Sequence, residues 1–245
     1  MVTPDRDTLQ AAGLLKNYGG KRVVDRVNIS LKRQEIVGLL GPNGAGKTTT
    51  FYMVVGLSHP DQGKVFLDGK DITADPMYRR ARKGISYLAQ EPSVFRKLTV
   101  EQNLLAILEL LDIQAPERKS RLQKALTELG IAHLAKQRAV SLSGGERRRL
   151  EITRALVTDP RFMLLDEPFA GIDPMAINDI QQIIRQLKER GLGIVISDHN
   201  VRETLSVCDN AYIISQGQII EEGPPDSIVN SEIARSAYLG ENFNL

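Results

Sequence analysis

The chain has 245 residues, 25% of them charged, and a formal net charge of only +2. This length allows one domain with a sizeable core, or one domain that carries a lobe, and the charge balance does not indicate a nucleic-acid partner. The only cysteine, Cys208, excludes an internal disulfide and a cysteine metal cluster and is typical of a reducing compartment.

The N-terminal segment, residues 1–7, carries charges of both signs and no apolar stretch, so it does not resemble a signal peptide. No apolar run approaches the roughly 18 residues that span a bilayer. We therefore expect a cytoplasmic protein without direct membrane insertion, which reaches a membrane only through a partner.

The first ninety residues predict a β-rich lobe around one glycine loop. Residues 9–18 and 23–31 carry apolar residues at strand-like spacing and are separated by Gly19-Gly20, which indicates two strands joined by a turn. A short apolar run at 35–40 predicts a buried strand before the loop, and 64–67 predicts a further strand.

The loop itself is Gly41-Pro42-Asn43-Gly44-Ala45-Gly46-Lys47-Thr48-Thr49. It fits the pattern G-x-x-x-x-G-K-[ST] between a strand and a helix expected at 48–55. Because its glycines carry no Cβ, successive backbone N–H groups can point at one anion, to which the helix N-terminus adds partial positive charge. Lys47 would reach the β- and γ-phosphates of a nucleotide, and the Thr48 hydroxyl would ligate Mg²⁺. The alternative is a glycine-rich turn before a helix.

The sequence pattern changes from strand-like to helical over residues 91–157. Thr99 and Gln102 fit a capping box that opens a helix at 100–111, and residues 117–129 continue with helical apolar spacing. We expect this lobe to be inserted into the sheet domain.

Buried strands are also expected at 85–89, 162–166 and 193–197. The strand at 162–166 should lie beside the strand of the glycine loop in a mostly parallel sheet, which would place Asp166 at the carboxyl edge, where ligands bind. Asp166 would then hold Mg²⁺ through its outer coordination sphere, and Glu167 would act as general base on the attacking water. Helix capping is the alternative role for these two carboxylates.

The C-terminal third predicts further elements. Pro174 suits the first position of a helix at 175–190, residues 211–215 and 218–221 predict a hairpin, and 226–245 predicts two short helices.

The last helix of the helical lobe opens with two glycines. Ser143 and Glu146 fit a capping box, which does not explain Gly144-Gly145, because each glycine in a first turn costs up to about 1 kcal/mol. Close approach of an anion would explain them. With Leu142 this segment reads Leu-Ser-Gly-Gly-Glu and resembles the signature of the nucleotide-binding subunits of ABC transporters.

The resemblance covers nearly the whole chain and implies one domain, 1–245, of the P-loop NTPase type. Its core would be a RecA-like, mostly parallel sheet with an antiparallel β-subdomain, formed by 1–90 and 158–245. Residues 91–157 would be the inserted helical subdomain that carries the signature.

The resemblance also implies roles for single residues in binding ATP and Mg²⁺. Tyr18 would stack on adenine, Gln90 would join the metal site to a membrane partner and contribute to catalysis, and His199 would contact the γ-phosphate. Asp173 would belong to a loop that crosses to another subunit. Packing or a plain structural role is the alternative for Tyr18, Gln90 and His199.

Assembly follows from the same resemblance. The chain has one glycine loop and one signature, and in this family the signature of one subunit closes over the nucleotide of another. A homodimer would have two composite sites, each with Lys47, Glu167 and His199 from one chain and Ser143 and Gly145 from its mate.

Finer features, including the run 166–174 and the terminal 238–243, are similar to the ATPase subunits of lipopolysaccharide export transporters. This implies two transmembrane permease subunits that dock near 90–98, where Phe95 is either part of the docking groove or core. Arg147-Arg148-Arg149 would form a solvated or ion-paired face. The alternatives are a branched-chain amino-acid importer subunit, a soluble ABC ATPase and a RecA-like motor.

Overall fold

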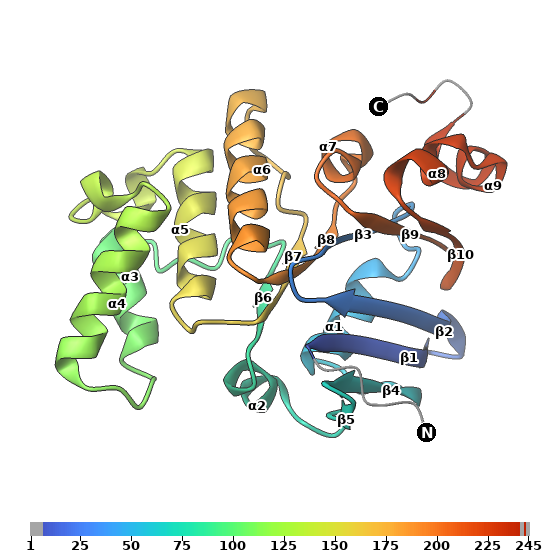
Figure 1. The fold of residues 1–245 in the computed structure, drawn as a ribbon, viewed down its shortest axis with the longest axis horizontal. Helices are drawn as coiled ribbons and strands as arrows, with labels where there is room; N and C mark the ends of the chain where they lie inside the picture. The colour runs from blue at the N-terminus through green and yellow to red at the C-terminus, as the bar shows by residue number, and fades with distance from the viewer. Residues whose placement is uncertain (1–6, 241–242, 244–245) are drawn as a thin grey trace.

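The computed structural model describes residues 7–240 and residue 243. Residues 1–6, 241–242 and 244–245 lie outside it, and with them most of the N-terminal segment 1–7 and part of the end of the segment 226–245. Two sheets and a group of helices make up the molecule (Figure 1). The helices α3, α4 and α5 lie at one end, and the antiparallel sheet lies at the other.

The antiparallel sheet has the strand order β2-β1-β4-β5. Its strands are β1 (Thr8–Tyr18), β2 (Lys21–Lys32), β4 (Gln62–Leu67) and β5 (Lys70–Asp71). The turn expected at Gly19-Gly20 joins β1 and β2, because both glycines have positive φ and Tyr18 pairs with Lys21 across them.

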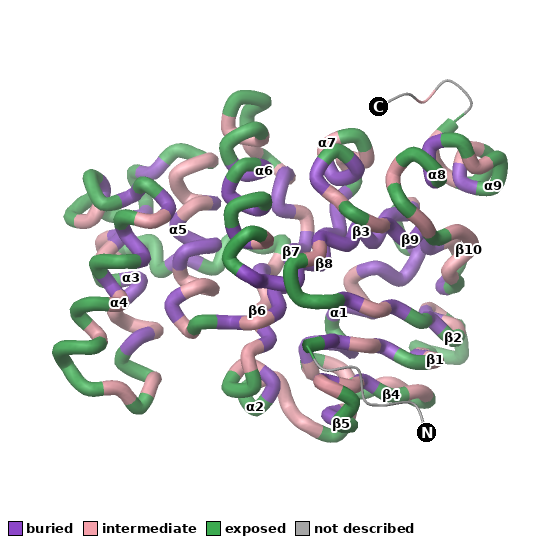
Figure 2. The backbone as a smooth tube through the Cα atoms, in the orientation of Figure 1, coloured by how far each residue is buried: buried purple, intermediate pink, exposed green. Residues whose placement is uncertain are grey.

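The larger sheet has the strand order β10-β9-β3-β8-β7-β6. Its strands are β3 (Ile36–Leu40), β6 (Ile85–Leu88), β7 (Phe162–Asp166), β8 (Gly193–Ser197), β9 (Asn210–Ser215) and β10 (Gln218–Gly223). All neighbours are parallel except β9 and β10, which form the expected antiparallel hairpin. Every residue of β3, β7 and β8 is buried, as expected for parallel strands covered on both faces (Figure 2).

The expected pairing of the 162–166 strand with the loop strand is wrong, because β8 lies between β7 and β3. A strand that comes later in the chain returns through α6 (Pro174–Glu189) and pairs with both. All five residues of β8 are buried, and so are all five of β7, so burial alone does not decide which strand lies next to β3. Asp166 nevertheless ends its strand at the carboxyl edge of the sheet.

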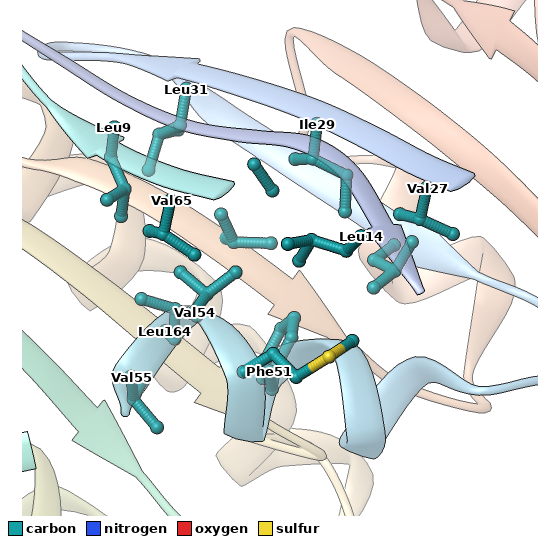
Figure 3. Packing of buried hydrophobic residues seen from close by; sticks show 14 of the residues in the cluster. Leu9, Leu14, Val27, Ile29, Leu31, Phe51, Val54, Val55, Val65 and Leu164 are labelled. Carbon is teal, nitrogen blue, oxygen red and sulfur yellow. The ribbon is translucent and has the colours of Figure 1, made fainter. Parts of the chain in front are cut away.

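The helix after the glycine loop, α1 (Lys47–Val55), lies between the two sheets. Phe51 and Val54 of α1 pack in one cluster with Leu14 and Val65 of the antiparallel sheet and Leu164 of the larger sheet (Figure 3). This apolar cluster fixes α1, and therefore the loop, against both sheets.

A short helix that the sequence pattern did not predict, α2 (Met77–Arg82), holds the other end of α1. The fully buried Arg80 donates from Nη1 to the carbonyls of Met53 and Val54, at 2.7 Å each. These carbonyls belong to the last turn of α1, where a cation stabilises the helix.

The helical lobe has an apolar cluster of its own, made only of residues between Val94 and Val157. Its elements are α3 (Val100–Leu108), α4 (Ala115–Glu128), the 3₁₀ turns at Ala132–Leu134 and Ala139–Ser141, and α5 (Gly144–Leu156). The Thr99–Gln102 capping box is confirmed. The division of the chain at 91 and 157 stays a prediction.

The first helix of the lobe is shorter than expected and ends at Leu108 rather than 111. Beyond it, Leu110 N–H bonds to Ile107 and Leu111 N–H to Leu108, so the last turn tightens to i→i+3 bonds. Leu110 is 78% exposed, and it gains no burial from a longer helix.

The remaining helices follow β7 in the chain and pack against the larger sheet. They are α6, opened by Pro174 as expected, α7 (Val201–Leu205), α8 (Pro225–Asn230), α9 (Glu232–Ala234) and a π-helical turn at Arg235–Leu239. Among the helices of the described residues, none combines the length and the apolar character that a bilayer crossing requires.

Candidate active site

A cavity of about 580 Å³ opens at the carboxyl edge of the larger sheet, in front of the glycine loop. It brings together residues from five separate parts of the chain: Val23, Asn43, Gly44, Gly46, Lys47, Thr48, Thr49, Gln90, Glu167 and His199. Sequence reasoning had named all of these except Val23.

The glycine loop needs its small residues for two different reasons. A Cβ on Gly41 would lie 2.0 Å from the Ile214 carbonyl oxygen, so the loop can pass β9 only without a side chain. Gly46, the N-cap of α1, has φ +107, and a Cβ there would lie 2.7 Å from the Val23 carbonyl oxygen, so both its backbone conformation and its surroundings require glycine. Free N–H groups at this end form an anion site.

Lys47 is buried at the base of the loop. Its Nζ donates to the carbonyls of Gly41 at 2.7 Å and Pro42 at 3.1 Å, so the ammonium is held inside the curve of the loop. Burial lowers the pKa of Lys47, and the charges of Glu167 and Asp166 oppose this shift. A phosphate in the cavity would give the ammonium an anionic partner in addition to these neutral ones.

Asp166 is 1% exposed and supplies a carboxylate behind the loop. Its Oδ2 accepts from the Tyr87 hydroxyl at 3.1 Å, while its buried Oδ1 has no hydrogen-bond partner among the described residues. Burial raises the pKa of Asp166, and the hydrogen bond from Tyr87 opposes the rise. An orphaned buried carboxylate oxygen next to a threonine hydroxyl fits a hard cation such as Mg²⁺, which prefers oxygen ligands.

Glu167 is the centre of a polar group at the cavity wall. Its Oε2 accepts from Gln90 Nε2 at 3.0 Å and lies 3.4 Å from His199 Nδ1. The carboxylate is therefore oriented from two sides by residues that sequence reasoning had named separately. Gln90 Oε1 is not engaged in this contact and can serve as an oxygen ligand toward the cation site.

The backbone at Glu167 has φ +47, which is uncommon for a residue with a side chain. Its N–H donates to the Ser197 carbonyl at 2.6 Å, so the turn is tied to the end of β8. Asp198, fully buried beside it, accepts from the Phe169 and Asn200 amides and so fixes both loops. Burial raises the pKa of Asp198.

The signature lies apart from this cavity. Gly144 lines a second hollow of about 450 Å³, together with Ala170, Gly171 and Ile172 of the loop before Asp173. Gln90 lines both hollows. Gly144 of the signature and the loop before Asp173 therefore meet at this second hollow.

The capping box of Ser143 and Glu146 is confirmed, and both of its backbone bonds are present. The structure adds an internal reason for one of the two glycines, because a Cβ on Gly145 would lie 2.9 Å from Ala176 Cβ of α6. A Cβ on Gly144 would meet nothing closer than 3.4 Å in the described part of the chain. Of the two glycines, only Gly144 is left without a reason inside that part of the chain.

Tyr18 and Asp173 are not among the residues that line the first cavity. Tyr18 is 49% exposed, and its hydroxyl lies 3.3 Å from Ser58 Oγ. Asp173 caps α6 by accepting from the Ala176 amide at 2.9 Å. Their roles in stacking and in subunit crossing stay predictions.

Sequence reasoning missed three supports of the site. Asp198 and Tyr87 each follow or belong to a predicted strand, and their polarity in an apolar run was the available signal. Tyr238, in the C-terminal tail, lies near the loop: burial raises its pKa, and the backbone of Gly41 opposes the rise. No local pattern marks that contact.

Comparison with known proteins gives a consistent picture of this site. The sequence profile of the ABC transporter family matches residues 24–170, which include the glycine loop, the signature and the 162–166 strand with its two carboxylates.

Relatives match almost the whole chain. A probable ABC transporter ATP-binding protein of Azorhizobium caulinodans is 56% identical over 238 residues, which are 97% of this chain and 85% of the relative. The lipopolysaccharide export system ATP-binding proteins LptB of Haemophilus influenzae and of Escherichia coli strain K12 are each 53% identical, over 97% of this chain and 99% of theirs.

Solved structures share the fold. The ADP conformation of an ATP-binding cassette of an ABC transporter superposes with a TM-score of 0.85 at 30% identity, covering 95% of this chain and 98% of that one. A nucleotide-free cassette gives the same score and identity.

Proposed function

The chain belongs to the family of ABC transporter ATP-binding proteins, and on that premise we propose that it hydrolyses ATP as the motor subunit of a lipopolysaccharide exporter. The observation that carries the chemistry is the cavity that joins the glycine loop to Gln90, Glu167 and His199. This cavity has an anion site, a set of oxygen ligands for a cation and a base around one space.

Hydrolysis converts ATP and water to ADP and phosphate. For this reaction the chain must bind the nucleotide, orient the attacking water and accept one proton from it. The loop amides and Lys47 hold the β- and γ-phosphates. Glu167 accepts the proton of the attacking water, and the hydrogen bond from Gln90 aims its carboxylate. His199, beside the same oxygen, would contact the γ-phosphate.

Thr48, Asp166 and Gln90 are the residues that would hold Mg²⁺. They offer a hydroxyl, a carboxylate and an amide oxygen, and the unpartnered Asp166 Oδ1 is the observation that favours a cation here. When bound, the cation supplies charge neutralisation for the phosphates.

We propose a homodimer with composite sites, because the signature and the loop before Asp173 share a hollow separate from the first cavity. In a two-fold arrangement, Ser143 and Gly144 of one copy would face the nucleotide held by Lys47 of the other. Binding of ATP would close the pair, and hydrolysis would release it.

The transported molecule is proposed from the relatives named LptB, which match at 53% identity from end to end. The membrane partners would be two transmembrane subunits, and the chain would lie at the inner face of the inner membrane through them.

The test is reconstitution with membrane partners from the same organism. Vesicles that contain the lipopolysaccharide export pair and this chain should release lipopolysaccharide when ATP is supplied, measured by transfer to an external acceptor. The Glu167→Gln variant serves as the inactive control. If the chain instead assembles with a branched-chain amino-acid importer and drives uptake, the proposed substrate is wrong.

We place the docking site near residues 90–98, where Phe95 is 47% exposed and its ring lies 4.9 Å from the Arg154 guanidinium. An aromatic ring that is about half exposed and packs against an arginine of α5 is suited to contact a partner protein. Phe95→Ala should leave the ATPase rate of the isolated chain near normal and weaken assembly, measured by co-purification with the permease pair. Unchanged co-purification would remove Phe95 from the interface.

A further inference from the structure

The run Arg147-Arg148-Arg149 near the start of α5 was expected from sequence to form a solvated or ion-paired face, and the structure differs from this at Arg148. Arg149 does form an ion pair, with Asp179 of α6. Arg148 is also ion-paired, to Glu151 at 3.0 Å, but both side chains are buried, at 7% and 4% exposure. Arg148 is therefore directed into the protein and away from solvent.

All five N–H donors of the Arg148 guanidinium have acceptors. One of these is the carboxylate of Glu151, and the other four are main-chain carbonyls. The carbonyls belong to Ala89 at 3.3 Å, Asp166 at 3.1 Å, Glu167 at 3.0 Å and Pro168 at 3.2 Å.

These four carbonyls come from only two segments. Three are consecutive and form the turn that follows β7, and the fourth immediately precedes Gln90. The side chains carried by these segments, Glu167 and Gln90, are themselves hydrogen-bonded at 3.0 Å. One side chain of α5 thus holds the backbone on both sides of the contact that orients the base.

The turn needs such an anchor. Glu167 has φ +47, and a residue in this region costs of order 1 kcal/mol or more unless its surroundings over-determine it. Arg148 binds the carbonyls before, at and after this residue, which fixes the turn in the strained form.

Glu151 completes the arrangement from the same helix. Its Oε2 pairs with Arg148, and its Oε1 accepts from the Ser93 amide at 3.1 Å. The buried charges are therefore matched, and the second contact holds the segment after Gln90 to α5 as well.

We propose that Arg148 is a positioning residue through which the signature helix sets the orientation of Glu167 and Gln90. The inference rests on the proposed ATPase function and deepens it. Because α5 begins at the signature, a displacement of this helix when Ser143 and Gly144 meet a nucleotide moves the guanidinium, and with it the turn that carries the base. Arg148 lines the second hollow but not the first cavity, so it acts on the chemistry in that cavity through these residues.

Arg148→Lys is the first test variant, because it keeps the charge opposite Glu151 but offers three donors from one point, which cannot reach four spread carbonyls. Arg148→Met combined with Glu151→Gln is the second, since it leaves no unpaired buried charge and the amide oxygen introduced on α5 can still accept from Ser93. Arg121→Lys is the matched control, on an exposed pair with Glu117 of α4.

We expect kcat to fall about 10- to 100-fold in both Arg148 variants, with the Kd for ATP within about twofold of the parent chain. Added to Glu167→Gln, Arg148→Lys should cause no further loss in single-turnover rate, because both changes remove the same contribution. In the nucleotide-free chain, the amides of Glu167, Phe169 and Ala170 should exchange with solvent faster, while the Arg121 control stays unchanged.

Three results would overturn the inference: an unchanged kcat, an additive loss on the Glu167→Gln background, or unaltered amide exchange in the turn. An inactive parent chain would instead overturn the proposed function, and the exchange measurement, which needs no activity, would still decide the role of Arg148.

Discussion

Replacing Glu167 by Gln should abolish turnover while leaving ATP binding intact. The amide is isosteric and can keep a hydrogen bond with Gln90, now at 3.0 Å from the carboxylate, but it cannot accept a proton from water. General base catalysis contributes about 10²- to 10⁴-fold, so kcat should fall by that factor, measured by phosphate release.

The Kd for ATP of the Glu167→Gln variant should stay within about twofold of the parent chain, because no phosphate ligand is removed. This measurement is the control for the loss of kcat. Asp166→Asn, by contrast, should weaken binding in the presence of Mg²⁺. Full activity of Glu167→Gln would exclude Glu167 as the base and transfer that role to another cavity residue.

The second large effect concerns Ser143, which is exposed at the start of α5. Ser143→Arg should abolish hydrolysis, because a bulky side chain at the helix tip would keep this tip away from the nucleotide of the other copy. Lys47→Ala should abolish it by removing the phosphate ligand. In a composite site these two defects lie in different chains, so mixing the variants should restore activity.

When the two variants pair at random, half of the dimers are mixed, and each mixed dimer has one intact site, so about a quarter of the parent activity should return. The control is each variant alone at the same total concentration. A mixture without any activity would mean that each chain completes its own site.

The local parts of the site could be predicted from sequence because their chemistry depends on near neighbours. The glycine loop and the Ser143–Glu146 capping box each satisfy backbone groups within a few residues. The Asp166-Glu167 pair was marked by its place at the end of an apolar strand, although its hydrogen bonds reach the distant Ser197 and Tyr87. The parallel sheet also followed from fully apolar strands.

Contacts between distant segments could not be predicted in this way. The order of the central strands depends on how α6 returns the chain, and β7 and β8 are equally buried, so their places cannot be read from hydrophobicity. In the sequence Arg148 resembles a surface charge, and only the positions of Ala89 and the turn at the end of β7 show that it has four main-chain carbonyls to bind.

Gly145 is a residue that the sequence pattern assigned to ligand binding although packing also requires it. Its small size in a helix pointed to an anion, yet the close approach of Ala176 in α6 is sufficient to require it. A glycine in a binding motif can serve packing and ligand approach together, and the sequence alone does not separate the two.

The central claim is that nucleotide is held between two copies of this chain. The most direct test is the solution mass of the Glu167→Gln variant, measured by light scattering with ATP and Mg²⁺ and again with Ser143→Arg added. The first sample should have twice the mass of one chain, and the second should have the mass of one chain while still binding ATP. A single-chain mass for the ATP-bound Glu167→Gln variant would contradict the account.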